Sequence, residues 1–390
     1  MKLLSDYSHI HGVCHNPDPD KSKEQIDFEL ACAERLQVNS ARFWIEQEKW
    51  EADPNGYFDM ILHFVRRCGA HGISVMPIFW NGNPIKEFKE PDEAGWKKME
   101  EYASAVVALL HNEPNILMWD VMNEPYCNDY IRNCADETEK ARRQEQIKAL
   151  VRRMCSIVRG LDPDGVLTVG HEFISHCPTT NDLVDVISFH DYLTTRAEIE
   201  AVYQEAEAQS EKTGKPILNT ETGCVGRTNP YDVELEICQK HKVGWYLFCL
   251  VTEGFWGDIH GIIYPDGTVR DPSIVAAMLG FFRNRTPDRI RYVPNKEGHA
   301  FKAVEAVRDV LDTREITLFH SKRVTTDDIL EAAERCANLL EGAEMVPMWD
   351  LPSARIADWR AQPEEERDLL AIRKFAYELA KLVQDNCLVL

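Results

Sequence analysis

Short apolar runs alternate with longer amphipathic segments from the N-terminus to about residue 285. Apolar runs of this length are typical of strands buried on both faces, and amphipathic segments are typical of helices that cover a sheet. The alternation therefore predicts repeated strand–helix units around a parallel sheet. Eight strands are expected, near residues 7–13, 39–44, 73–80, 115–123, 166–170, 185–190, 216–221 and 244–251. Eight such strands favour a closed (β/α)8 barrel, the TIM barrel, of the α/β class.

The amphipathic segments predict the helices of the outer layer. They are expected at residues 23–36, 57–69, 94–110, 138–159, 196–212 and 230–242, with a further segment at 273–282 that covers the last strand. Glycine-containing joints such as Ala70-His71-Gly72 stand where a helix should stop before the next strand.

The pattern changes near residue 290, so the chain is expected to divide into a barrel, 1–290, and a mostly α-helical appendage, 291–390. The appendage should hold a strand at 315–319, a helix at 326–340 and a highly charged helix that begins near Pro363. The last helix has an apolar face at helical spacing, made of Ile372, Phe375, Ala376, Leu379, Leu382 and Val383. This face should pack on the barrel or join two copies of the chain as a homo-oligomer.

The amino-acid composition limits the kinds of partner that the chain can bind. The formal net charge is -21, which opposes binding to nucleic acids and anionic membranes. The sequence contains no run of about 18 apolar residues, which is the length that could span a bilayer. The start lacks the apolar region of a secretory signal, so a cytoplasmic location is expected, or a secreted one if a signal peptide has been removed. The twelve cysteines have no Cys-x-x-Cys spacing, which favours reduced core residues.

Two acidic side chains follow expected strands at the point where each strand becomes a loop. Glu124 stands in Trp119–Pro125, and Glu221 stands in Ile217–Gly223. Hydrolysis of a sugar acetal with retention of configuration uses two carboxyl groups, one that protonates the leaving oxygen and one that attacks carbon. The two glutamates therefore indicate a glycosidase.

The tripeptide Asn-Glu-Pro occurs twice, and its position relative to the strand separates the two copies. Reactive groups of a barrel lie at the C-terminal ends of its strands. Glu124 lies just beyond the fourth expected strand, whereas Glu113 comes before it and so faces the opposite end. Glu113 is therefore interpreted as a turn residue.

Together with further residues, the two glutamates resemble the retaining glycosidases of the clan A (β/α)8 barrels, with glycoside hydrolase family 5 the nearest pattern. The set comprises Asn123-Glu124-Pro125, Glu221, Arg42 after Ser40-Ala41, and His190-Asp191-Tyr192. The resemblance covers roughly residues 5 to 285. It implies that Glu124 is the acid/base, that Glu221 is the nucleophile, and that Asn123 binds the sugar 2-hydroxyl, while His190 lines the same subsite.

Elementary electrostatics agrees with these roles. Arg42 should lower the pKa of Glu221 and keep it ionised, and Tyr192 should hold it in aim through a hydrogen bond. The negative charge of Glu221 and partial burial should keep the proton on Glu124 near neutral pH. Trp80 and Trp256 are candidate platforms for a sugar ring, with ordinary packing as the alternative for each.

The sequence departs from the family 5 pattern at two strands. The third strand ends in Phe79-Trp80-Asn81 where the family usually has a histidine, and the eighth ends in Phe248-Cys249-Leu250 where it usually has a tryptophan. Membership of the clan is therefore better supported than membership of the family.

The resulting hypothesis is a retaining β-glycosidase that needs no metal or organic cofactor and acts on a carbohydrate. Exo action on small oligosaccharides or glycosides, of the β-glucoside or β-mannoside type, is expected. One alternative is a metal-dependent amidohydrolase that uses neutral imidazoles as ligands, from His9, His11, His171 and His190. Another is a barrel that binds sugars without turnover, although such relatives normally lose one carboxylate.

Overall fold

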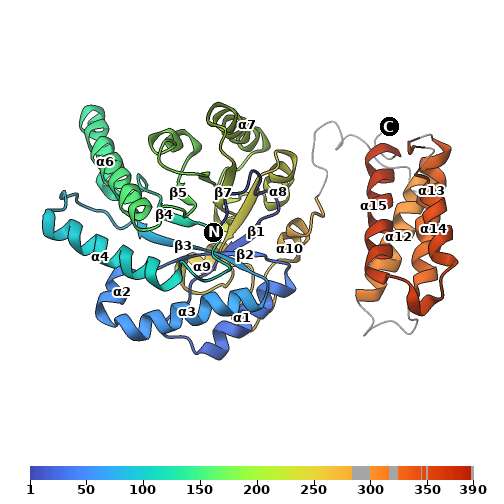
Figure 1. Ribbon diagram of the computed structural model, residues 1–390. Coiled ribbons are helices and arrows are strands. Elements are labelled where there is room, and N and C mark those ends of the chain that lie inside the picture. The colour runs from blue at the N-terminus through green and yellow to red at the C-terminus, as the bar shows by residue number, and fades with distance from the viewer. Residues whose placement is uncertain (283–298, 316–323, 344, 348–349, 388–390) are drawn as a thin grey trace. The chain divides into compact units, whose positions relative to one another are not determined.

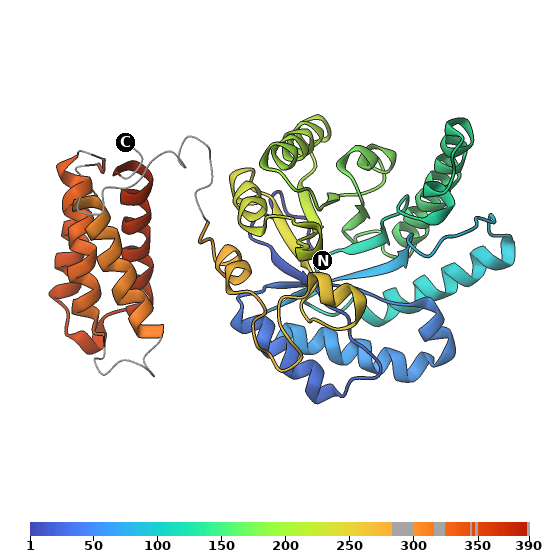
Figure 2. The ribbon, with the colours of Figure 1, turned by 180° about the vertical axis from the view of Figure 1, so that it is seen from behind.

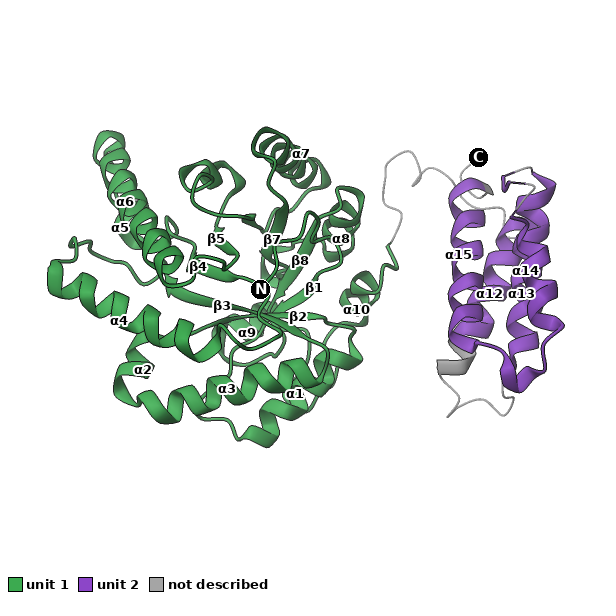
Figure 3. Cartoon of the chain, in the orientation of Figure 1, with its two compact units in different colours: residues 1–283 green, residues 284–390 purple. Residues whose placement is uncertain are grey.

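The computed structural model describes residues 1–282, 299–315, 324–343, 345–347 and 350–387. The chain forms two compact units, Met1–Arg283 and Asn284–Leu390 (Figure 3). The boundary expected between residues 290 and 291 lies outside the described residues. Among the described residues, no helix combines the length and the apolar character needed to cross a membrane.

The first unit is a closed barrel of eight parallel strands in which β1 pairs with both β2 and β8 (Figure 1). The predicted fold class is confirmed. The strands are β1 His11–Cys14, β2 Ser40–Trp44, β3 Ser74–Asn81, β4 Trp119–Asn123, β5 Leu167–His171, β6 Ile187–Asp191, β7 Ile217–Thr222 and β8 Gly244–Phe248.

Helices surround the strands on the outside of this barrel (Figure 2). The covering helices are α1 Lys23–Arg35, α3 Pro54–Ala70, α4 Glu93–Leu110, α6 Glu137–Leu161, α7 Arg196–Thr213, α8 Tyr231–Lys240 and α10 Pro272–Met278. Capping chemistry defines their ends: Thr195 and Glu198 form a reciprocal capping box at the start of α7, and Gly214 ends it with φ of 70°.

Short helices that sequence periodicity did not reveal lie in the loops that follow the strands. They are α2 Gln47–Ala52, α5 Asp129–Arg132 and α9 Gly254–His260, with 3-10 turns η1 Ile174–Thr179 and η2 Val225–Arg227. These loops follow β2, β4, β8, β5 and β7, and so stand at the end of the barrel where active sites of this fold form.

The interior of the barrel changes from apolar to polar along its axis. One end is filled by a cluster that includes Met76, Met118, Val186 and Leu218. Towards the C-terminal strand ends, the pairing register shifts between Asp120 and Asn123, between Phe189 and His190, and between Asn219 and Thr222. Such irregularities re-aim side chains, and here they occur on the strands that carry the two glutamates.

The second unit is α-helical. It contains α12 His299–Glu315, α13 Thr326–Gly342, α14 Pro352–Arg360 and α15 Leu369–Cys387. These helices share a core of their own in which the expected apolar face of α15 is buried, except that Leu382 is 44% exposed. Of the strand expected at 315–319, only Glu315 is among the described residues, and it is the last residue of α12. The sequence led us to expect the barrel or a second copy as the surface that buries the apolar face of α15, whereas the helices of its own unit bury it. A role of the appendage in packing or oligomerisation stays a prediction.

Candidate active site

Glu124 stands directly after β4, in a bend that turns its side chain towards other polar groups. Its φ of 44° lies in the left-handed region, which costs a residue other than glycine on the order of 1–3 kcal/mol. Its backbone N–H bonds to the Gly170 carbonyl at 2.8 Å. Gly82 packs against this bend so closely that a Cβ at position 82 would lie 2.2 Å from the Glu124 carbonyl oxygen. The neighbouring strands thus fix the backbone that carries this carboxylate.

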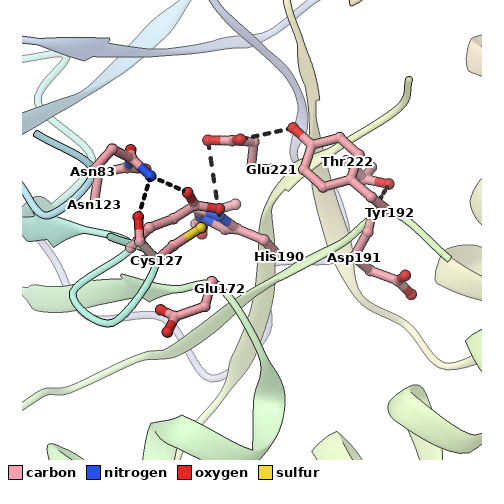
Figure 4. Close-up of polar contacts among 12 residues, drawn as sticks. Asn83, Asn123, Cys127, Glu172, His190, Asp191, Tyr192, Glu221 and Thr222 are labelled. Atoms are coloured by element: carbon pink, nitrogen blue, oxygen red, sulfur yellow. Dashed lines mark hydrogen bonds and ion pairs between the residues drawn. The ribbon is translucent and has the colours of Figure 1, made fainter. Parts of the chain in front are cut away.

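The Glu124 carboxylate accepts two hydrogen bonds. Asn83 Nδ2 donates to one oxygen at 2.7 Å, and His190 Nδ1 lies 2.9 Å from the other (Figure 4). Burial raises the pKa of Glu124, but the hydrogen bond and charge of His190 outweigh it, and with the Asn83 bond they lower the pKa to about 2. The direction of this pKa shift is therefore opposite to the one expected from the sequence.

Glu221 is held by a different pair of donors at the end of β7. Tyr192 donates its phenol O–H to one oxygen at 2.7 Å, and Arg42 Nη1 donates to the other at 3.0 Å. The residue is 7% exposed. The two hydrogen bonds restrict rotation of the carboxylate. The Tyr192 bond and the Arg42 ion pair expected from the sequence are both present.

The two carboxylates lie close together. One oxygen of Glu124, one oxygen of Glu221 and a ring nitrogen of His190 are all within 4.8 Å of one another. Retaining glycosidases place their carboxyl groups about 5–5.5 Å apart, whereas inverting enzymes leave roughly 6.5–9.5 Å for a water molecule. The separation favours retention.

Arg42 is fully buried and links the two halves of the site. Besides Glu221, its guanidinium binds Asp120 Oδ2 through Nε at 2.9 Å and Nη2 at 2.8 Å, and Asn123 Oδ1 at 2.8 Å. Gly170 makes room for it, because a Cβ there would lie 2.6 Å from Nη2. Burial alone would lower the pKa of Arg42, but the charge of Asp120 and its other anionic neighbours raises it, so the guanidinium stays charged.

Sequence reasoning missed Asp120 and Asn83. Asp120 is fully buried within β4, and a buried acid inside an expected strand next to a candidate site was the signal for it. Asn83 lies in the loop after β3 and reaches both Glu124 and the Asn123 side chain. No pattern in that loop marks it.

The two candidate platforms have different surroundings. Trp80 is 9% exposed, packs edge-on against Tyr102 of α4 and directs its indole N–H towards Gln47. These contacts are those of a packed core residue rather than of a platform for a sugar ring. Trp256, on α9, is 54% exposed, and its ring lies 6.0 Å from that of His260. His260 in turn lies 5.4 Å from the ring of Tyr192, so one ring stands between Trp256 and Tyr192.

An aromatic pair stands where the sequence departs from the family pattern. Phe248, at the end of β8, lies edge-on to Trp44 at 5.9 Å, and the Arg42 guanidinium lies 5.2 Å from the Trp44 ring centroid. At the end of β3, Asn81 accepts a hydrogen bond from Asn123 at 3.2 Å in place of a histidine contact.

The arrangement contradicts the amidohydrolase alternative. His9 is exposed and precedes β1, and His11 begins β1 and stacks on Trp245 at the start of β8. His171 and His190 lie at the opposite, C-terminal ends of β5 and β6. Among the described residues, the one group of three potential ligands is Glu124, His190 and Glu221.

Comparisons with known proteins agree with this geometry. Residues 80–254 match the family model described as cellulase, glycosyl hydrolase family 5. No curated protein matches the chain.

Solved structures with the same fold include two mannanases and a glucuronidase. The endo-1,4-β-mannanase from Rhizomucor miehei has a TM-score of 0.53 at 15% identity, over 68% of this chain and 91% of its own. The endo-1,4-β-D-mannanase from Thermotoga petrophila RKU-1 has a TM-score of 0.52 at 16% identity, over 69% and 98%. The β-glucuronidase 2 from Bacteroides uniformis has a TM-score of 0.52 at 15% identity, over 71% and 35%. At sequence identities of 15–16%, the likeness shows a shared fold and not a shared activity.

Proposed function

We propose that this chain, whose barrel is a glycoside hydrolase domain of the family 5 type, cleaves β-glycosidic bonds with retention of configuration. The observation that carries the proposal is the pair of carboxylates at the strand ends, with oxygens within 4.8 Å and separate sets of donors. No step of the reaction requires a metal or an organic cofactor.

In the first step, a Glu221 oxygen attacks the anomeric carbon as the bond from that carbon to the leaving oxygen breaks. Glu124 gives a proton to the leaving oxygen, and a glycosyl ester on Glu221 results. In the second step, Glu124 removes a proton from water, the water oxygen attacks the anomeric carbon, and Glu221 is released. Two inversions at carbon give net retention.

The donors around Glu221 suit its role as nucleophile. Arg42 and Tyr192 hold its two oxygens from different directions, so the orientation of the carboxylate is fixed. When the ester forms, the negative charge leaves Glu221. The Arg42 guanidinium keeps its bonds to Asp120, which balances its charge through both steps.

β-Mannosides and β-glucosides are the proposed substrate class. The mannanases among the solved structures of the same fold support a β-mannoside, although they are distant relatives. Trp256 supplies an exposed aromatic face next to His260, on which a sugar ring can stack. The preference for short substrates and exo action rests on the sequence. A four-sugar substrate tests it, since release of single sugars from one end supports exo action and products from the middle contradict it.

A panel of aryl β-glycosides, assayed with the wild-type protein, tests activity and sugar identity together. Proton NMR of the first product formed tests the mechanism: a β-anomer supports retention, and an α-anomer contradicts it. No turnover of any β-glycoside, including natural disaccharides, would favour a barrel that only binds sugars.

The two glutamates are separated by azide rescue. Glu221→Gly should lose nearly all turnover and regain part of it with azide, giving an α-glycosyl azide. Glu124→Ala should give the β-glycosyl azide from a substrate with an activated leaving group. The same azide product from both variants would contradict the assigned roles.

A further inference from the structure

Two buried carboxyl groups lie behind the site, on the side of β6 and β7 that faces the helices. Asp191, at the end of β6, is 3% exposed, and Glu234, on α8, is fully buried. Among the described residues, no lysine, arginine or histidine forms an ion pair with either one. Two buried carboxylates without a cation cannot both be ionised at low cost.

The hydrogen bonds around Asp191 leave one oxygen unexplained. Its Oδ1 accepts from the Leu193 N–H at 2.9 Å, whereas Oδ2 is buried and has no conventional donor. The Asp191 and Glu234 side chains are in hydrogen-bond contact. A bond between two carboxyl groups requires that one of them carry a proton, and this proton supplies the missing donor.

The electrostatics places that proton on Glu234. Burial and the charge of Asp191 raise the pKa of Glu234 well above its ordinary value. Burial raises the pKa of Asp191 to about 6, so Asp191 is the ionised partner at neutral pH. The other titratable groups that face the pair are Tyr203 and Glu198 of α7 and Cys238 of α8. None of them supplies a positive charge.

The same network reaches the backbone of β6 and β7. Tyr203 donates to Glu234 at 2.7 Å and accepts from Asn219 Nδ2 at 2.8 Å, while Asn219 Oδ1 accepts from the Glu221 N–H at 3.2 Å. The next residue of β7, Thr222, donates its hydroxyl to the Asp191 carbonyl at 2.6 Å.

Asp191 lies between the two residues that contact the catalytic carboxylates. His190 contacts Glu124 and Tyr192 donates to Glu221. The register shift that precedes His190 brings it opposite Glu221. Figure 4 shows the Asp191 side chain pointing away from Glu221, while Tyr192 points towards it. Whatever fixes Asp191 therefore also fixes its two neighbours.

We propose that Asp191 and Glu234 share one proton and act as a positioning pair, which holds the His190–Tyr192 segment and the Glu221 backbone in the geometry needed for glycosyl transfer. This role rests on the proposed glycosidase function. Neither residue touches the substrate. The working state is the pair with a single proton, because a second ionisation would place two carboxylates side by side in the protein interior.

The test uses the full chain and two replacements of Glu234 with similar volume. Glu234→Gln keeps a neutral group that donates to Asp191, so kcat should stay within about threefold of the wild type. Glu234→Leu removes the donor, and because a displacement of about 1 Å of a reacting group costs roughly 10²-fold, kcat should fall by roughly 10- to 100-fold with little change in KM. The rate of labelling of Glu221 by a 2-fluoro glycosyl inactivator should fall in parallel.

A matched control is Glu29→Gln. Glu29 is a buried acid on α1 that forms an ion pair with Lys21 at 2.7 Å and contacts the His15 ring at 3.1 Å. Because this carboxylate is charged, its replacement should lower thermal stability and leave kcat unchanged. Glu234→Gln should show the reverse, with wild-type stability.

A direct readout does not depend on activity. Carbon-13 NMR of labelled glutamate carboxyls at pH 7 should show one protonated glutamate in the wild type that is absent in Glu234→Gln. The proposal is overturned if no protonated carboxyl is seen, if Glu234→Gln is as impaired as Glu234→Leu, or if Glu234→Leu keeps full kcat. If the wild type turns over no β-glycoside while the protonated signal is present, the proposed function fails and the shared proton stands.

Discussion

Replacement of Arg42 by methionine should destabilise the barrel far more than loss of a surface ion pair. Arg42 is fully buried and donates four hydrogen bonds to oxygen atoms, two to Asp120 and one each to Glu221 and Asn123. Asp120 is also fully buried, so without the guanidinium it becomes an uncompensated charge. Breaking a buried pair in this way costs about 3–5 kcal/mol in the free energy of unfolding.

The change in the unfolding temperature follows from the size of the barrel. For a domain above 250 residues, each kcal/mol shifts the midpoint by roughly 2 °C, so the expected loss is roughly 6–10 °C by scanning calorimetry. The control is Arg66→Met. Arg66 is 63% exposed and pairs with Glu113 at 2.8 Å, so its loss should cost less than about 1 kcal/mol.

A double variant tests the cause. Arg42→Met with Asp120→Asn removes both charges and keeps an acceptor for the Gly170 N–H, which bonds to Asp120 Oδ1 at 3.0 Å. It should be more stable than Arg42→Met alone, because no unpaired Asp120 charge remains. The reasoning is refuted if the single variant loses less than about 1 kcal/mol, or if the double variant is the less stable of the two.

Three further predictions follow from the same contacts. Burial raises the pKa of Glu29, but the contacts with His15, Lys21 and Gln25 together outweigh it and lower the pKa from 4.5 to about 2. The carboxylate therefore adds about 3 kcal/mol above pH 4.5, a contribution lost as pH falls towards 2, so acid titrations of Glu29→Gln and wild type should converge. Asn83→Ala removes a donor to Glu124, which should raise its pKa and move the alkaline limb of kcat/KM to higher pH; an unmoved limb would contradict this. Trp256→Ala should raise KM about 2- to 10-fold with kcat unchanged, and an unchanged KM for every substrate of the panel would exclude it as a platform.

The barrel could be predicted because its strands are buried on both faces. A parallel strand of this kind reads as a continuous apolar run, and all eight runs became strands. The boundaries were less predictable where a strand begins. The fourth run started at 115 in the sequence, but residues 115–118 precede β4, and only Ile116 forms an isolated bridge there.

The structure brings together the six residues of the predicted site other than the two tryptophans, because they follow strands that end at the same face. The acid inside the expected strand was visible in the sequence, but the direction of the Asp120 side chain was not predictable. A register shift separates Asp120 from Asn123, and strict alternation does not apply between them. The alternation of side chains along β3 allows Trp80 to face the site, but Tyr102 covers its ring. This contact depends on how α4 packs, which the local sequence does not reveal. Long-range packing, rather than local pattern, separates a platform from a core residue.

The proton needed for the first chemical step has to be considered for Glu124 and His190 together. Sequence reasoning compared Glu124 with Glu221 alone, and their repulsion would raise the pKa of Glu124. The structure adds His190, 2.9 Å from Glu124 and 3.8 Å from Glu221, so the imidazole stands between two negative charges. The hydrogen bond and charge of His190 lower the pKa of Glu124, against the effect of that repulsion. As the leaving oxygen gains negative charge, Glu124 passes a proton to it, and the contact with Nδ1 of His190 holds the carboxylate that then accepts a proton from water. We therefore expect His190→Ala to move the alkaline limb of kcat/KM to higher pH, since loss of this contact raises the pKa of Glu124, and a fall in kcat without that shift would contradict this account.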